Sequence, residues 1–286
     1  MNNGPFLFLG SFVALLLSWL GLIVIPQVQL RDLQPAKNET TGRFYPVQRL
    51  GLARQGAEVY RANACYACHS QQIRQTGYGF EAVIEKGGND PDALAAALVR
   101  VNREWSVDDA ELFGEGDALE LGPIDLRRKQ SIEQTLDKAK IGDLEAKIRF
   151  DFIPEGPDIQ RGWGLRASVA RDYLYEDTLM LGSQRLGPDL SNVGARLPNR
   201  DWHLLHLYHP RATVEGSTMP AYEFLFEKRR QGETPSPNAL KLEGDLAPEP
   251  GWEVVPTADA LALVAYLQSL KVTEALYEAP ATVAVE

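Results

Sequence analysis

The apolar residues of the chain's first thirty positions form one continuous run. No charged side chain occurs from Met1 to Leu30, and residues 5–25 are dominated by Phe, Leu, Val and Ile. About 20 such residues span a bilayer core as a helix, so we predict a membrane anchor over residues 1–30. A cleaved signal peptide is the alternative, but it would need a basic start, a shorter apolar core and an Ala-x-Ala-like site.

Two further helices are predicted near the ends of the remaining chain. The first covers residues 51–64 and carries an apolar set with one interrupting glycine, Gly56. The second begins at Thr257, which can cap it, and its apolar residues recur at three- and four-residue spacing. That stripe consists of Leu261, Val264, Ala265, Leu267 and Leu270.

The stretch between these helices is predicted to contain a helical insertion, at about residues 76–175. One helical face would carry Leu94, Leu98, Val101 and Trp105. A second helix would start at a capping box of Ser131 and Gln134, with Ile132, Leu136, Leu144 and Ile148 as its buried stripe. Residues 231–256, rich in proline, glycine and acidic side chains, read as a surface loop. The tail, residues 273–286, is expected to be extended or disordered.

Composition narrows the possible partners. The formal net charge is −10, which disfavours nucleic acid and favours a basic soluble protein as a partner. The length after the anchor allows one large core or two small ones, and we predict one domain over residues 50–272 that follows a linker at residues 31–49.

The strongest chemical signal is Cys65-Tyr66-Ala67-Cys68-His69. Two thiols one helical turn apart, followed at once by an imidazole, are the attachment signature of c-type haem. Each thiol can add to a vinyl group while His69 binds the iron. The chain has only these two cysteines, which leaves none for a disulfide framework.

Two alternatives use the same thiols. A zinc site would pair Cys65 and Cys68 with two of the histidines at 203, 206 and 209, but the intervening loop would far exceed the roughly 12 to 15 residues of a finger. A redox dithiol requires a strand before the motif, whereas the residues before Cys65 read as a helix.

A low-spin haem needs a second axial ligand, usually methionine in cytochromes c. Met219 is favoured because Pro220 stiffens the loop that must hold a weak thioether bond. Met1 begins the anchor and lies on the wrong side of the membrane, and Met180 reads as an ordinary core or loop residue. His203, His206 and His209 lie within one arc of a helix and read mainly as packing or surface residues, with a distal ligand or separate metal site as the alternative.

Residues around Pro188 can support the haem. The backbone carbonyl of the Gly187-Pro188-Asp189 segment can accept a hydrogen bond from the second nitrogen of His69 and fix its orientation. Arg185 and Arg196 flank this segment and are candidates to contact the haem propionates, with solvated surface arginines as the alternative.

Together these features predict a mainly α chain: one N-terminal transmembrane helix and a class I cytochrome c-like domain with a helical insertion. Class I cytochromes c pack their first and last helices against each other, and glycine permits the close approach. Gly56 and Tyr266 are the expected crossing residues.

The motifs also resemble a specific family. Cys65-Tyr66-Ala67-Cys68-His69-Ser70-Gln71-Gln72-Ile73-Arg74, the later Gly182-Ser183-Gln184-Arg185-Leu186-Gly187-Pro188-Asp189-Leu190, Trp202-His203 and Met219-Pro220-Ala221-Tyr222 resemble the membrane-anchored mono-haem subunit of cbb3-type cytochrome c oxidases. The resemblance covers residues 5–74 and 180–226. It implies one covalent haem c at Cys65 and Cys68, with His69 and Met219 as axial ligands.

The resemblance implies a role as well. Such a subunit takes an electron from a dihaem cytochrome c subunit, or from a soluble cytochrome c, and passes it to the catalytic haem-copper subunit. It has no oxygen-reducing site of its own. The expected location is the bacterial inner membrane, with the haem domain on the periplasmic face. Arg31, Lys37 and Arg43 after the anchor favour the opposite orientation, but c-type maturation takes place outside the cytoplasm and decides the prediction.

Other functions remain open on the sequence. The chain has features expected of the haem c subunit of a nitric oxide reductase or of a free membrane-tethered cytochrome. A different class, a sensor or peroxidase, would leave Met219 unbound and one iron position open.

Overall fold

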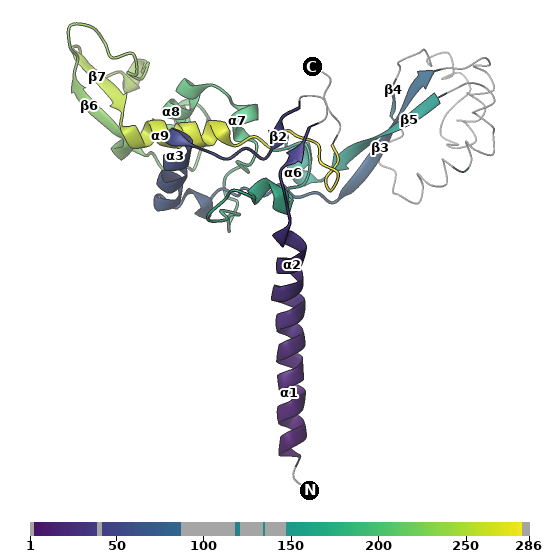
Figure 1. The fold of residues 1–286 in the computed structure, drawn as a ribbon. Coiled ribbons are helices and arrows are strands. Elements are labelled where there is room, and N and C mark those ends of the chain that lie inside the picture. Colours follow the sequence, from purple (N-terminus) through teal and green to yellow (C-terminus); the bar gives the residue numbers. More distant parts are fainter. Residues whose placement is uncertain (1–2, 39–41, 87–117, 121–133, 135–146, 282–286) are drawn as a thin grey trace. The chain divides into compact units, whose positions relative to one another are not determined.

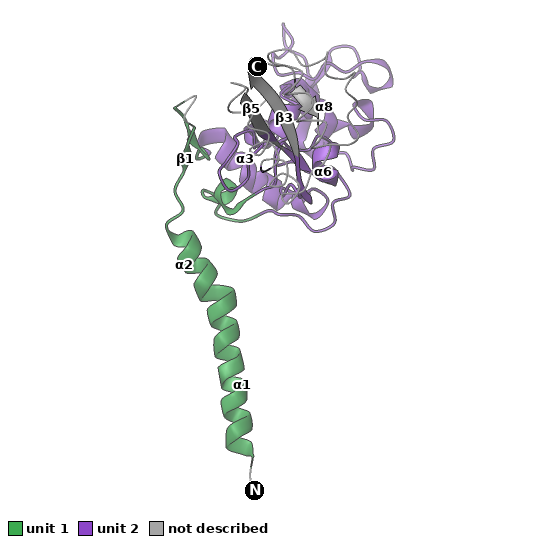
Figure 2. Cartoon of the chain, turned by 90° about the vertical axis from the view of Figure 1, so that its right-hand side faces the viewer, with its two compact units in different colours: residues 1–48, 169–179 green, residues 49–168, 180–286 purple. Residues whose placement is uncertain are grey.

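The computed structural model describes residues 3–38, 42–86, 118–120, 134 and 147–281. Its contacts divide the chain into two units. Unit 1 comprises Met1–Gln48 with Val169–Leu179, and unit 2 comprises Arg49–Ser168 with Met180–Glu286 (Figure 2).

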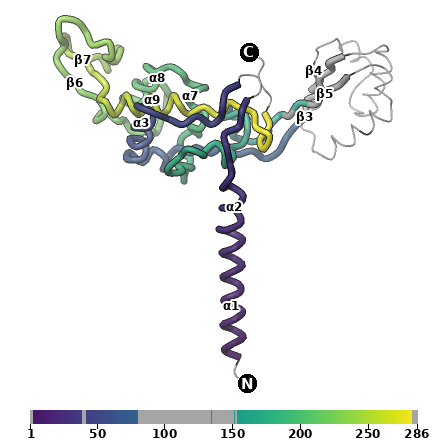
Figure 3. The backbone as a smooth tube through the Cα atoms, in the orientation of Figure 1, coloured from purple at the N-terminus to yellow at the C-terminus, as the bar shows by residue number. Residues whose placement is uncertain are grey.

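Unit 1 is dominated by one long apolar helix. Helix α1 (Gly4–Trp19), a π-helical turn (Leu20–Val24) and α2 (Ile25–Arg31) are continuous, as the tube in Figure 3 shows. Pro26 has no N–H to bond to the carbonyl four residues earlier, and the π turn ends two residues before it, at Val24. The 28 residues have a mean hydropathy of 2.5 in their most apolar window, which makes this helix a candidate membrane anchor. The predicted N-terminal spanning helix is therefore confirmed as an element.

The rest of unit 1 is a small ladder with a turn. Strands β1 (Ala36–Lys37) and β2 (Phe44–Tyr45) pair antiparallel. The Tyr45 hydroxyl donates to Asp172 at 2.7 Å, which ties the ladder to the 3-10 turn η5 (Ala170–Tyr173). This contact joins segments that are 127 positions apart in the sequence.

Unit 2 is built around two crossing helices, α3 (Gly51–Ala62) and α9 (Ala258–Ser269). A Cβ at Gly56 would lie 1.9 Å from the Ala262 carbonyl oxygen and 2.7 Å from the Tyr266 Cβ, so only glycine allows this approach. The predicted crossing at Gly56 and Tyr266 is confirmed. The predicted cap is also present, because Thr257 Oγ1 accepts from the Ala260 N–H at 3.3 Å.

Short helices complete the core of unit 2. They are η2 (Cys65–Ala67), α6 (Pro157–Gln160), α7 (Val193–Arg196), α8 (Arg200–Tyr208), η6 (Pro210–Ala212), η7 (Glu223–Leu225) and η8 (Gly244–Leu246). Apolar residues from α3, α8 and α9 share one buried cluster, which includes Tyr60, Leu204, Leu207, Leu263, Val264 and Tyr266. The described residues confirm the predicted fold class, which is mainly helical with one N-terminal helix that is a candidate membrane span.

The described part of the insertion contains a three-stranded sheet, which the sequence does not predict, together with the short helices α6 and η5. Strands β3 (Gly77–Lys86), β4 (Ala118–Glu120) and β5 (Lys147–Glu155) pair antiparallel in the order β4-β3-β5 (Figure 1). The prediction that Ile148 belongs to a helical stripe is wrong, because Ile148 lies in β5. Ile148, Phe150 and Phe152 alternate with polar residues, and this period of two is the strand pattern. The helical predictions for residues 94–105 and 131–144 fall outside the described residues, except for Gln134.

The predicted surface loop at residues 231–256 is wrong at its C-terminal end, which is a strand. Its last residues form β7 (Trp252–Pro256), which pairs with β6 (Phe226–Arg230). Val254 and Val255 are β-branched and buried, and their preference for a strand outweighs the flanking prolines.

The tail prediction is wrong for its described part, residues 273–281. Leu276 and Ala279 are buried and form a bridge with each other. The fully buried Arg166 donates from Nε to the Glu274 carbonyl at 2.6 Å. The tail is thus packed, because it covers apolar side chains and satisfies a buried guanidinium.

Candidate haem-binding site

The end of α3 delivers the cysteine motif. The Asn63 side chain donates to the Val59 carbonyl at 2.8 Å and closes the last turn of the helix. Ala64 then takes a left-handed conformation, with φ of 51°, which turns the chain sharply into η2. The His69 N–H donates to the Cys65 carbonyl at 2.9 Å, so the cysteines and the histidine occupy one tight turn. A left-handed alanine is a strained residue of the kind that clusters at functional sites.

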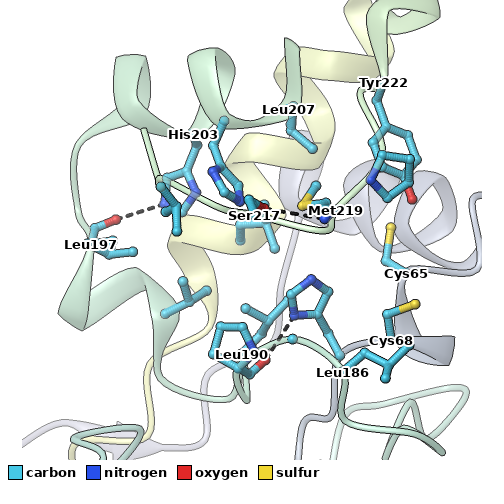
Figure 4. Close-up of a pocket in the computed structure, with 18 of the residues that line it drawn as sticks. Cys65, Cys68, Leu186, Leu190, Leu197, His203, Leu207, Ser217, Met219 and Tyr222 are labelled. Carbon is cyan, nitrogen blue, oxygen red and sulfur yellow. Dashed lines mark hydrogen bonds between the residues drawn. The ribbon is translucent and has the colours of Figure 1, made fainter. Parts of the chain in front are cut away.

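A cavity of about 480 Å³ lies beside this turn. Cys65, Cys68, His69 and Met219 all line it, although Met219 is 150 positions beyond His69 in the sequence. Figure 4 shows Met219 and the two cysteine sulfurs bordering the same space, with Leu186, Leu190 and Leu207 as apolar lining. A mostly apolar cavity of this size is typical of a cofactor site.

The His69 ring is held from two directions. Its Nδ1 lies 2.9 Å from the Pro188 carbonyl oxygen, so Nδ1 is the donor and Nε2 keeps its lone pair. This is the contact that the sequence predicts. A Cβ at Gly187 would lie 2.3 to 2.9 Å from three ring atoms, so the glycine backbone packs directly on the imidazole. Burial lowers the pKa of His69, against the opposing effects of Pro188 and Asp189, and favours the neutral ligand form.

The residues after His69 are fixed by two buried carboxylates that the sequence reasoning missed. Asp189 accepts from the Ser70 hydroxyl at 2.6 Å and from the Gln72 N–H at 2.8 Å. Asp158 accepts from the Arg74 N–H at 2.8 Å. Both carboxylates are fully buried. Asp189 had a signal in the sequence, because it adjoins Pro188, whereas nothing local marked Asp158.

One polar and one apolar contact hold the remaining residues of the segment after His69. The Gln71 amide lies 2.9 Å from the Tyr266 hydroxyl, and Ile73 is 2 % exposed. A Cβ at Gly164 would lie 2.0 Å from Ile73, so the chain passes closely over that side chain. The Ser-Gln-x-Ile-Arg continuation therefore has a structural role, since each of its five residues has a specific partner.

Arg185 does not fulfil the prediction of a propionate contact. It is absent from the cavity lining, and its guanidinium donates to Ser70, to Asp158 and to the Gln72 carbonyl. Burial raises the pKa of Asp158, but the hydrogen bonds from Arg185 and the Arg74 N–H and the charges of both arginines hold it below its ordinary value.

Arg196 does line the cavity. Its Nη2 donates to the Asp189 carbonyl at 2.8 Å, while its buried Nε has no partner among the described residues. Burial lowers the pKa of Arg196, against the opposing charge of Asp189. A buried donor without a partner suits an anionic group, and a haem propionate meets that requirement. The residues present therefore fit a haem.

Met219 lies on a lightly held loop. Its N–H donates to Ser217 Oγ at 3.3 Å, and the Tyr222 N–H donates to the Leu207 carbonyl at 2.8 Å. Met180, in contrast, is 8 % exposed in the core cluster, as the sequence indicates.

His203 and His206, which lie in α8, line the same cavity but also have other partners. His203 Nε2 lies 2.8 Å from the Leu197 carbonyl oxygen (Figure 4). His206 stacks on Trp202 at 4.8 Å and approaches Thr213 Oγ1 at 2.6 Å, and burial lowers its pKa to about 4. His209 ends the helix and is not part of the cavity lining. Within the described residues, no three His, Cys, Asp or Glu side chains gather as a metal site, which gives the zinc alternative no support.

Comparison with known families addresses the same part of the chain. The model of the family described as cytochrome c oxidase, mono-haem subunit/FixO, matches residues 158–247. The match supports a mono-haem oxidase subunit of the FixO type. It includes the Arg185–Pro188 segment and Met219, but it begins after Cys65, Cys68 and His69. A search of curated proteins gives no match.

The FixO match bears on the cofactor and the fold. A mono-haem subunit contains haem, which agrees with the size and lining of the cavity. The family is part of a cytochrome c oxidase complex, and a candidate anchor helix fits a membrane-bound subunit. A mainly helical, cytochrome c-like domain is consistent with the same family.

Proposed function

We propose that the chain relays electrons within a cbb3-type terminal oxidase, through one haem c attached covalently at Cys65 and Cys68. His69 and Met219 are its axial ligands. The observation that carries this proposal is that these four residues line the same cavity. The haem supplies a one-electron centre that alternates between the ferric and ferrous states.

The residues of the cavity suit fast electron exchange. The Pro188 carbonyl fixes the orientation of His69, so the ligand has little freedom to rearrange. A neutral thioether from Met219 favours the ferrous state and raises the reduction potential relative to a second histidine. Leu190 and Leu207 exclude water from the cavity, and Arg196 is placed to hold a propionate.

The partners follow from the role. The donor is a dihaem cytochrome c subunit or a soluble cytochrome c, and the acceptor is the catalytic haem-copper subunit. The haem domain faces the periplasm of a bacterial inner membrane, because thioether attachment takes place outside the cytoplasm. The candidate anchor, which carries no charged side chain before Arg31, supports permanent attachment to that membrane.

The first test is covalent haem. The purified chain is run on a denaturing gel and stained for haem peroxidase activity, beside the double variant Cys65→Ser, Cys68→Ser. The native chain should retain stain and the double variant should lose it completely. Met180→Leu, a core change away from the cavity, should stain normally. Staining of the double variant would show that the haem is not held by these thiols.

The second test is the complex. Tagged chain extracted in mild detergent should copurify with a polytopic haem-copper subunit and a dihaem cytochrome c. Recovery with a nitric oxide reductase subunit, or alone, would overturn the oxidase role while leaving the haem site intact. Rapid carbon monoxide binding by the reduced native chain, with no delay for release of Met219, would instead favour the sensor or peroxidase function, because it needs a permanently open iron position.

A further inference from the structure

Arg185 connects two segments that are far apart in the sequence. Its Nη1 and Nη2 donate to the Asp158 carboxylate at 3.2 and 2.7 Å, and its Nε donates to Ser70 Oγ at 2.7 Å. Ser70 directly follows His69 in the sequence. Asp158 lies three positions after the end of β5, the last strand of the insertion. One side chain therefore joins the ligand segment to the base of the insertion.

The contacts that the Arg185 side chain makes at the same time require a planar guanidinium. Besides the two-point contact with Asp158, Nη2 lies 3.4 Å from Asp189, and the group stacks over the Trp163 ring at 5.3 Å. Its side chain is 15 % exposed. The backbone is left-handed, with φ of 53°, a conformation that costs about 1 to 3 kcal/mol and persists only where contacts impose it. Lysine keeps the charge but has no planar fork to make these contacts together.

The conformation of Arg185 sets the position of the residues that touch His69. Gly187 and Pro188 follow it by two and three positions, and they supply the ring packing and the carbonyl acceptor. The Gly187 N–H also donates to the Cys68 carbonyl at 3.0 Å. A change at Arg185 is thus transmitted to His69 over a short, tightly bonded segment.

The base of the insertion belongs to the same network. The Thr76 N–H donates to the Glu155 carbonyl at 2.8 Å, where β3 and β5 begin their pairing. A Cβ at Gly156 would lie 3.1 Å from the Arg74 carbonyl oxygen. The strands leave the domain directly from the residues that Asp158 holds.

We propose that Arg185 is a positioning residue for the haem, which holds the Gly187–Pro188 segment on His69 and links that hold to the base of the insertion through Asp158. This inference rests on the proposed haem site. A firm hydrogen bond from Nδ1 makes His69 a more basic ligand, which stabilises the ferric state. Loosening the segment should therefore favour the ferrous state.

The test uses the full haem-loaded chain with Arg185→Lys, which preserves the charge and removes the fork. At a fixed applied potential, the ratio of reduced to oxidised haem should rise by about threefold. In proton NMR of the paramagnetic protein, the His69 Nδ1 proton should exchange with solvent faster. Ser70→Ala, which changes no charge and removes the Nε partner, should shift both quantities in the same direction.

Arg161→Gln is the matched control. Arg161 also lies near Asp158, at 3.9 Å, and over the Trp163 ring, at 5.0 Å, but the structure gives it no bond to Ser70. Removing its positive charge should leave the ratio unchanged or move it slightly toward oxidised haem. An equal rise in Arg161→Gln would show that Trp163 or charge, and not positioning, sets the ratio.

Coupling to the insertion is tested by a double-mutant cycle of Arg185→Lys with Asp158→Asn. The change in the ratio of reduced to oxidised haem in the double variant should be clearly smaller than the product of the two single changes, because both substitutions break the same Arg185–Asp158 contact. Full additivity would overturn the link through Asp158. Unchanged ratio and proton exchange in both Arg185→Lys and Ser70→Ala would overturn the positioning role. Failure of the proposed haem site is distinguishable, because the native chain would then carry no covalent haem.

Discussion

The two sides of the haem cavity are held by different kinds of contact. The His69 side, residues 65–74 and 182–191, is fixed by buried carboxylates, the partly buried guanidinium of Arg185 and a glycine packed on the ring. The Met219 side, residues 213–222, is held mostly by local turns, by side-chain contacts of Thr213 with His206 and of Ser217 with Arg211, and by a backbone bond from Tyr222 to Leu207.

The difference assigns different tasks to the two ligands. Imidazole binds iron strongly and needs a fixed orientation, which the His69 side supplies through long-range contacts. A thioether binds weakly, and most of the Met219 loop is exposed. Segments with few buried contacts open at low free-energy cost, so the Met219 side should be the first to release the iron.

The largest expected effect is on the His69 side. Asp189→Ala would leave the donors of Ser70, Gln72 and Ser191 without their acceptor and should cost about 3 to 5 kcal/mol of unfolding free energy. Glu215→Ala, in the exposed part of the Met219 loop, should change the unfolding free energy by less than about 0.5 kcal/mol. Urea unfolding of the haem-loaded chain measures both, and equal losses would contradict the comparison.

The next largest loss of stability is expected from substitution of a glycine on the His69 side, compared with a glycine on the Met219 side. Gly187→Ala places a methyl group within 3 Å of three His69 ring atoms and should cost about 1 to 3 kcal/mol, with a visible change in haem ligation. Gly216→Ala has nothing within 4 Å but is strained, because its φ is +71°, and should cost about 1 to 2 kcal/mol with an unchanged spectrum. An altered spectrum in Gly216→Ala alone would reverse the roles of the two sides.

Acid should loosen the His69 side within a defined range. The pKa of Asp158 is held below its ordinary value of 3.8, so the carboxylate stabilises the fold fully above that pH. The contribution is lost as the pH falls through the lower pKa of the folded state. Unfolding free energy measured from pH 6 to pH 2 should show a step below about pH 4 that is reduced in Asp158→Asn. A step of the same size in that variant would assign it to other carboxyl groups.

The smallest effect is on the Met219 side. Ser217→Ala removes one long hydrogen bond to the Met219 N–H and should cost about 0.5 kcal/mol. Carbon monoxide should then bind the reduced haem faster than in the native chain, because the loop opens more often. A slower rate would mean that Ser217 favours the open loop.

Local patterns in the sequence predict several features of the fold and of the His69 side of the cavity. The crossing of Gly56 and Tyr266, the cap at Thr257 and the Pro188 contact to His69 follow from local patterns or from a single motif, and the structure contains each of them. The anchor helix also follows from composition alone.

What the sequence did not predict depends on partners distant in the chain. The local sequence of Arg185 predicts a propionate contact, because it does not reveal that Asp158 lies beside this side chain. The spacing of Ile148 to Leu144 fits one helical turn, whereas its alternation with Phe150 and Phe152 fits the strand that the structure contains. The prolines near Val254 and Val255 predict a loop, because the strand that pairs with these valines lies on the other side of the prolines in the sequence.

The central claim is that Met219 completes the coordination of a haem whose other ligand is His69. The direct measurement is the weak charge-transfer absorption between a methionine sulfur and ferric iron, in the native chain and in Met219→Leu. The band should be present in the native chain and absent from the variant, while haem stain on a denaturing gel stays unchanged. A band that survives in Met219→Leu would contradict the account, because another residue would then supply the sulfur.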